Sequence, residues 1–432
     1  MKAAALKFAR VDFVRNFAVV SGGGLVAQLI LLGSAPLISR LYSPEAFGVQ
    51  GLFLSLGGIM AAGAGLSYPI AIVLAKEQEE AMRLLKLSCY IAGVQSLAAL
   101  VLFYFLGDLF LGQFGLGDLT GVILLVPLFM FFTTLSSAVN QVCIRERQFG
   151  LTSEVNIVSA IVSVAARIGG GLFWASGAFL SLVSTLVLLL KTLHLWTRRK
   201  VPAPVGDPEQ PAAASPGSYW ALARRYGDFA TLRTPQVLLS TVTRGTPIIL
   251  LGSLFDVDAA GLYAFAFTFL VIPVDLIATS IMQVLYPKIT EAWRAGADIM
   301  KMIFKVTAIL AAAGLVPVLL LFFAGPTLFG WAFGSVWREA GGFAGWMVVL
   351  FYFQILTRPM LTAFPVLKLQ KAALVYEIAA TLVKILAMYV GFYVFETALT
   401  AVMLFSLAGA GMYIALMLWF ALRRRDPAAA RS

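Results

Sequence analysis

Long apolar stretches, separated by short polar breaks, repeat along the whole chain. Each has the length of about 20 residues that a helix needs to cross a bilayer. The pattern predicts spanning helices at 14–38, 47–75, 87–107, 120–143, 152–174, 176–196, 231–252, 260–285, 302–324, 343–365, 373–395 and 398–421. Because helices satisfy their own backbone groups in lipid, we predict an all-α polytopic membrane protein with about 12 transmembrane helices.

The basic residues are confined to alternate breaks between these spans. Of the 32 Lys and Arg residues, 26 fall on the side that holds the N-terminus, two (Arg40 and Arg338) fall on the other side, and four lie within spans. Positive charge marks the cytoplasmic face, so we predict that both termini are cytoplasmic. The net charge of +11 is scattered over loops without interleaved aromatic residues, and we expect no nucleic-acid partner.

A polar segment rich in Pro and Ala divides the chain into halves. We predict an N-terminal six-helix lobe (1–197), a cytoplasmic linker (198–229), a C-terminal six-helix lobe (230–422) and a basic cytoplasmic tail (423–432). The composition of the linker is typical of a flexible segment.

Short stretches of the two halves match each other. "LYSPEAFGVQGLFLSL" (41–56) and "LFDVDAAGLYAFAFTF" (254–269) follow the first and the seventh span, and Tyr-Pro recurs late in the next span of each half. "RERQFG" in the connection between the fourth and fifth spans and "LKLQKA" between the tenth and eleventh place Gln148 and Gln370 at matching positions. The halves therefore look like repeats, which predicts two six-helix bundles around a central cavity, a common transporter plan.

These stretches, together with "LISRLYSPEAFGVQGLF" and "LFGWAFGSVWREAG", resemble polysaccharide flippases of the Wzx type, in the multidrug/oligosaccharidyl-lipid/polysaccharide exporter superfamily. The resemblance covers nearly the whole chain. It implies a bacterial inner-membrane protein that moves undecaprenyl-pyrophosphate-linked oligosaccharide across the membrane by alternating access. The products would be O-antigen, capsule or exopolysaccharide. It also implies contact with membrane lipids and with a polysaccharide polymerase and chain-length regulator.

Four cations lie inside predicted spans, where a charge costs about 2.5–3.5 kcal/mol on insertion scales. Arg244 in "LLSTVTRGTPIILLG" is about 13 residues into its helix, and Lys384 is near the middle of its own. Arg167 and Arg358 lie closer to span ends, where the side chains can also reach the interface. We assign all four as candidate cavity cations for the pyrophosphate head group, because cations form charge-assisted hydrogen bonds with phosphate oxygens.

Two acids accompany these cations. Asp275 is at mid-membrane and Glu377 is closer to the cytoplasm. Either one could bind a coupling ion or serve as a counter-ion; for Asp275 these readings are equally supported. The sequence has no nucleotide-binding loop and predicts no cofactor, so energy would come from a gradient of H⁺ or Na⁺ or from substrate flow.

Two other functions compete with this one. A drug/cation antiporter of the same superfamily would favour acids in its cavity, whereas cations outnumber acids here. A membrane glycosyltransferase or polymerase would need catalytic residues in a long outer loop, and the outer loops are short. We therefore expect a transporter and not an enzyme.

Overall fold

The computed structural model describes residues 2–75, 77–113, 117–200 and 218–423, and its regular structure there is helical. Most of the predicted linker (201–217) and of the basic tail (424–432) lies outside these ranges. Within the described residues, 12 helices are long and apolar enough to cross a membrane, one for each predicted span. The all-α polytopic architecture predicted from the apolar pattern is thus confirmed.

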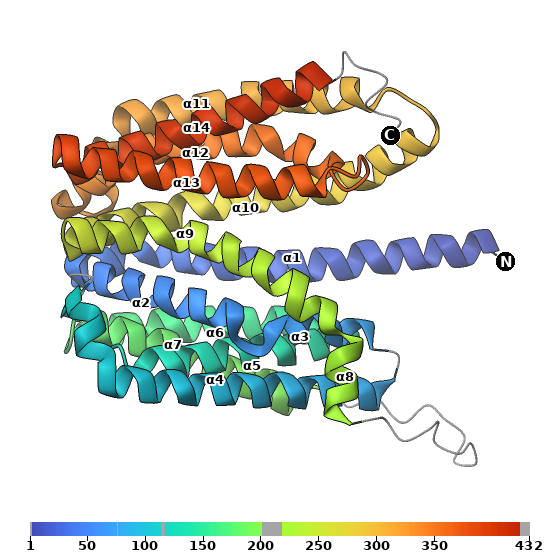
Figure 1. Cartoon of the computed structure of the whole chain (residues 1–432), viewed down its shortest axis with the longest axis horizontal. Coiled ribbons are helices and arrows are strands. Elements are labelled where there is room, and N and C mark those ends of the chain that lie inside the picture. Colours follow the sequence, from blue (N-terminus) through green and yellow to red (C-terminus); the bar gives the residue numbers. More distant parts are fainter. Residues whose placement is uncertain (1, 76, 114–116, 201–217, 424–432) are drawn as a thin grey trace. The chain divides into compact units, whose positions relative to one another are not determined.

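The chain forms two compact units, Met1–Gly245 and Thr246–Ser432 (Figure 1). Unit 1 contains α1 (Lys2–Leu41), α2 (Pro44–Gly63), α3 (Tyr68–Ala71), α4 (Gln78–Gln113), α5 (Leu125–Arg145), α6 (Phe149–Gly171), α7 (Gly177–Arg198), α8 (Tyr219–Arg225) and the first half of α9 (Thr234–Leu254). Unit 2 contains the rest of α9, α10 (Val257–Arg294), α11 (Ile299–Phe333), α12 (Arg338–Ala363), α13 (Gln370–Phe395) and α14 (Ala398–Arg423). The division falls inside α9, which the sequence analysis places in the C-terminal lobe.

The internal repeat is visible in the residues that begin equivalent helices. Ser43 accepts a hydrogen bond from the backbone N–H of Ala46 at the start of α2, and Asp256, 213 positions later, accepts one from Ala259 at the start of α10. Such side chains satisfy N–H groups that have no partner within the helix. The matched stretches of the two halves therefore perform the same structural task.

A second pair of equivalent positions closes the turn before the fifth helix of each half. Arg147 and Lys368 both have positive φ, at 55° and 56°. In both turns the next residue donates its N–H to a carbonyl five positions back, from Gln148 to Cys143 and from Leu369 to Phe364. The backbone thus pairs Gln148 with Leu369, so the sequence match of Gln148 with Gln370 is wrong by one position. Side-chain identity aligned two glutamines, whereas the turn geometry fixes the true register.

The second span is interrupted, which the continuous apolar pattern did not predict. After α2, the residues Gly65, Leu66 and Ser67 have φ of 72°, 49° and 55° before α3 begins. The N–H of Gly65 donates to Oε1 of Gln95 on α4 at 3.2 Å, and a Cβ at position 65 would lie 2.7 Å from Cγ2 of Thr134 on α5. The break is therefore buried against its neighbours, the setting in which non-helical backbone is tolerated at membrane depth.

Candidate functional site: charged and polar residues within the spans

Lys384 is a buried cation inside unit 2. It lies 14 residues into α13, about 21 Å from the start of the helix, and its side chain is 9% exposed. Nζ lies 5.6 Å from the centroid of the Phe405 ring on α14. Among the described residues, no carboxylate comes within 4.0 Å of Lys384 to form an ion pair. The aromatic ring stabilises this charge without neutralising it.

A glycine on α14 makes room for the lysine stem. A Cβ at Gly409 would lie 3.1 Å from Cδ of Lys384 and 2.3 Å from Cδ1 of Leu350 on α12. The stem therefore runs through the seam where α13 and α14 approach each other. The position of this cation is determined by packing, and a larger residue at 409 would displace it.

Glu377 lies two helical turns before Lys384 on α13, and it is half-buried. The negative charge of Glu377 acts on Lys384. Thr381 lies between the two on the same helix, one turn after Glu377, and its hydroxyl donates a hydrogen bond to the Glu377 carbonyl at 2.8 Å. Arg358 on α12 is half-buried, and its Nε is buried without a hydrogen-bond partner in the described chain. Unit 2 thus contains two of the predicted cations, Lys384 and Arg358, and both predicted acids.

Arg167 belongs to a polar cluster inside unit 1. Its Nη2 lies 3.5 Å from Oγ of Ser184 on α7, and its carbonyl accepts a hydrogen bond from the Tyr42 hydroxyl at 2.8 Å. Gln50 of α2, which is 4% exposed, donates from Nε2 to the same Ser184 oxygen at 2.9 Å. The guanidinium of Arg167 is therefore directed into the helix bundle. The assignment of Arg167 as a cavity cation stays a prediction.

Arg244 is exposed and lies on the half of α9 that belongs to unit 1. The next residue brings α9 close to α2, since a Cβ at Gly245 would lie 3.3 Å from both Ile59 and Ser55. Helix α9 continues through Pro247. Asp275 is half-buried on α10 of unit 2, and its carbonyl accepts a hydrogen bond from Thr279 at 2.8 Å. The two residues belong to different units, and both readings of Asp275, as a coupling-ion site and as a counter-ion, stay predictions.

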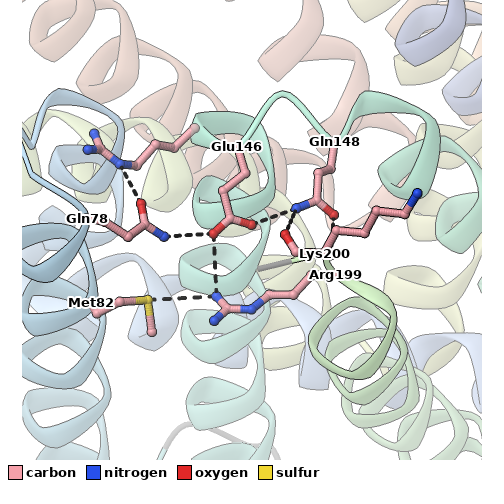
Figure 2. A network of polar contacts seen from close by, with 7 residues as sticks. Gln78, Met82, Glu146, Gln148, Arg199 and Lys200 are labelled. Atoms are coloured by element: carbon pink, nitrogen blue, oxygen red, sulfur yellow. Dashed lines mark hydrogen bonds and ion pairs between the residues drawn. The ribbon is translucent and has the colours of Figure 1, made fainter. Parts of the chain in front are cut away.

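A further network ties together the helix ends that surround Arg145 and Arg198, here called the basic end of unit 1. Figure 2 shows Glu146, between α5 and α6, in contact with residues from three neighbouring segments. Its carboxylate accepts hydrogen bonds from Gln78 and Gln148, both at 2.8 Å, and lies 3.9 Å from the Arg199 guanidinium. The Glu146 side chain is 1% exposed and that of Arg199 is 9% exposed. This buried pair holds the end of α7 against α4 and α5.

The arrangement is suited to binding, because the predicted intramembrane charges are all carried by helices. Within the described ranges, no three His, Cys, Asp or Glu residues come together that could hold a metal ion. Sequence reasoning identified the charged residues but missed their polar and aromatic neighbours. Gln50 could have been found as a lone amide in an apolar run, whereas nothing in the sequence marks Phe405 among 33 phenylalanines.

The architecture is shared with solved membrane transporters. An inward-facing multidrug resistance MATE family transporter of the MOP superfamily has a TM-score of 0.68 at 14% identity, covering 93% of this chain and 96% of its own. Lipid II flippase MurJ, in an inward closed conformation, has a TM-score of 0.69 at 14% identity, covering 92% and 86%. An outward-facing MATE transporter has a TM-score of 0.60 at 13% identity, covering 97% and 96%. The fold is that of the MOP superfamily of transporters and flippases.

Sequence comparison identifies the family. The profile of the family described as "Polysaccharide biosynthesis protein" matches residues 37–341, which is most of the chain. No curated protein matches the sequence at a significant level. The chain belongs to the polysaccharide biosynthesis protein family and is a multi-pass membrane protein.

Proposed function

We propose that this protein is a flippase that moves polyprenyl-pyrophosphate-linked oligosaccharide across the bacterial inner membrane. The membership in a polysaccharide biosynthesis family supports a glycan substrate, and the fold supports transport across the bilayer. The undecaprenyl carrier, the oligosaccharide and alternating access are parts of the proposal. The basic loops favour cytoplasmic termini, so that substrate would enter from the cytoplasm.

The observation that carries the proposal is the buried, unneutralised ammonium group of Lys384 at mid-membrane depth. A cation kept in such a place is expensive, and intramembrane ionisable residues are functional by default. A pyrophosphate carries the opposite charge and strong acceptor oxygens, and so it would offset the cost of both charges as it passes. Arg244, Arg167 and Arg358 are the further cations that we propose for this role, with the polyprenyl tail remaining in lipid.

The proposal is tested with the purified protein in lipid vesicles that contain a polyprenyl-pyrophosphate oligosaccharide. Transfer is measured as the appearance of the glycan on the opposite leaflet, where a membrane-impermeant lectin can bind it. We expect Lys384→Met to lower the rate at least tenfold and Lys384→Arg to retain part of it, because arginine keeps the charge. The matched control is Lys371→Met, which removes an exposed charge from the first turn of the same helix.

Equal rates for Lys384→Met and wild type would exclude the lysine from the transport path. Absence of any lectin-accessible glycan with wild-type protein, combined with uptake of a cationic dye, would instead favour the drug/cation antiporter. Imposed gradients of H⁺ and Na⁺ in the same vesicles test the coupling ion, for which Asp275 and Glu377 are the proposed sites or counter-ions. A polymerase and a chain-length regulator are the proposed partners that would consume the product.

A further inference from the structure

Helix α8 lies within the predicted linker (198–229), yet it is attached firmly to unit 1. Leu222 is 9% exposed and packs in a core cluster with residues of α4, α5 and α7, among them Leu84, Val142 and Leu195. Nη1 of Arg225 lies 2.9 Å from the Glu80 carboxylate on α4. The hydroxyl of Tyr68 donates to the Ala223 carbonyl at 3.1 Å. Three separate contacts therefore fix the rotation of this short helix about its axis.

The residue that ends α8 strengthens this attachment. Tyr226 forms a side-chain hydrogen bond with Glu80, and burial, followed by the negative charge of Glu80, raises the pKa of the Tyr226 hydroxyl. The phenol is protonated at neutral pH, so that it can donate to the Glu80 carboxylate. Glu80 thus contacts both Arg225 at the end of α8 and Tyr226 directly after it.

The opposite face of α8 presents an aromatic ring and a cation. Trp220 is 76% exposed and Tyr219 is 48% exposed. Arg224 follows Trp220 by one helical turn, so the two side chains are neighbours on the helix surface. Arg224 is exposed and forms no ion pair within the described part of the chain, in contrast to Arg225. This face therefore carries an uncompensated positive charge beside a large apolar ring.

The direction of α8 relates this face to the membrane. In Figure 1 the helix runs across the helices of unit 1, beside the basic end. Its ion pair with Glu80 is with the first turn of α4, and Leu222 shares a core cluster with Cys143 and Leu195, which lie in the last turns of α5 and α7. The ends of membrane-spanning helices are expected near the level where the hydrocarbon core meets the head groups, and Trp and Tyr are enriched at this level. Helices that lie in the interface carry aromatic residues toward the lipid and basic residues toward the head groups.

We infer that the Trp220–Arg224 face of α8 binds the head group of an anionic phospholipid, which holds α8 at the surface of the membrane. The charge selects an anionic head group, and the indole ring supplies apolar contact at the same depth. In water, the same face would leave the Trp220 ring exposed and Arg224 without an ion-pair partner in the described part of the chain. This inference does not depend on the proposed transport function.

The test measures binding of phosphatidylglycerol to the detergent-purified full chain by native mass spectrometry. A basic residue near an anionic surface contributes about 1 kcal/mol, so we expect Arg224→Gln to weaken the binding about fivefold. Trp220→Ala should weaken it as well, and phosphatidylcholine should bind wild type no better than it binds the variants. Lys200→Gln, which removes an exposed charge at the same end but off α8, is the matched control and should bind like wild type.

A second measurement locates this face directly. In a background without Cys89 and Cys143, a spin label at Trp220→Cys in phosphatidylglycerol nanodiscs should be more accessible to oxygen than to a water-soluble nickel reagent. A label at Lys200→Cys should show the reverse. Full access of the nickel reagent to position 220 would overturn the inference and would favour a soluble protein as the partner of this face. Unchanged phosphatidylglycerol binding by Arg224→Gln and Trp220→Ala would overturn it as well.

Discussion

Replacing Lys384 with methionine should make the protein more stable and less active at the same time. The side chain is 9% exposed inside unit 2, and the Phe405 ring lies 5.6 Å from its charge. A lysine at the centre of a spanning helix costs about 2.5–3.5 kcal/mol. A cation–π contact returns about 0.5–2 kcal/mol of that cost. Methionine fills similar space without a charge, so the free energy of unfolding of Lys384→Met should rise by about 0.5–3 kcal/mol.

The assay combines thermal unfolding of the purified protein in detergent with the vesicle transfer measurement. Lys384→Ala is the companion variant, because it removes the charge and the stem together and leaves a cavity beside Gly409. We expect the methionine variant to unfold at a higher temperature than wild type and the alanine variant to unfold below the methionine variant. A methionine variant less stable than wild type would refute the reasoning, because Lys384 would then stabilise the fold instead of destabilising it.

Three further substitutions have definite expected outcomes. Arg244→Ala should abolish glycan transfer at normal protein levels and Arg244→Lys should retain part of it; full transfer by the alanine variant would contradict the cavity role. Glu146→Gln should lower the free energy of unfolding by about 1–3 kcal/mol, because Arg199 loses its charged partner. Chemical denaturation measures this change, and an unchanged midpoint would show that the ion pair contributes nothing to stability. Gly341→Ala should destabilise unit 2 by at least about 1–3 kcal/mol, because a Cβ there would lie 2.2 Å from the Gly325 carbonyl oxygen. Gly342→Ala, whose Cβ would meet only Leu399 at 3.5 Å, is the control and should unfold like wild type.

The spans could be predicted from the sequence because bilayer thickness sets a minimum length of apolar residues. The ends of the helices were less predictable. Helix α10 continues past the predicted end at residue 285 to Arg294, and α11 begins at Ile299, before the predicted start at residue 302. The interruption at Gly65–Ser67 was not predicted, because an apolar run continues through it and the matching Tyr286-Pro287 of the other half lies within the unbroken helix α10. Such a break depends on Gln95 and Thr134, which are distant in sequence.

The site was predictable only as a set of charges. A charge within an apolar run is visible in one dimension, and both Lys384 and Arg167 were found that way. Their surroundings depend on which helices pack together, so the Ser184 contact of Arg167 and the Phe405 contact of Lys384 could not be inferred. The two lobes also differ where the repeat would suggest likeness. At the offset that pairs Arg147 with Lys368, the position of Arg167 corresponds to Met388.

The interruption of the second span has a consequence for the order in which the protein is built. A ribosome delivers Gly65 to the membrane 30 residues before Gln95, whose side chain accepts the Gly65 N–H in the folded protein. Until α4 arrives, that N–H in lipid would need another partner, and a plain continuation of α2 supplies one. Span 2 should therefore enter the membrane as an unbroken helix and unwind only when α4 and α5 pack against it. Unwinding at this point would be a late step of assembly, and a truncated chain that stops before residue 95 should lack it.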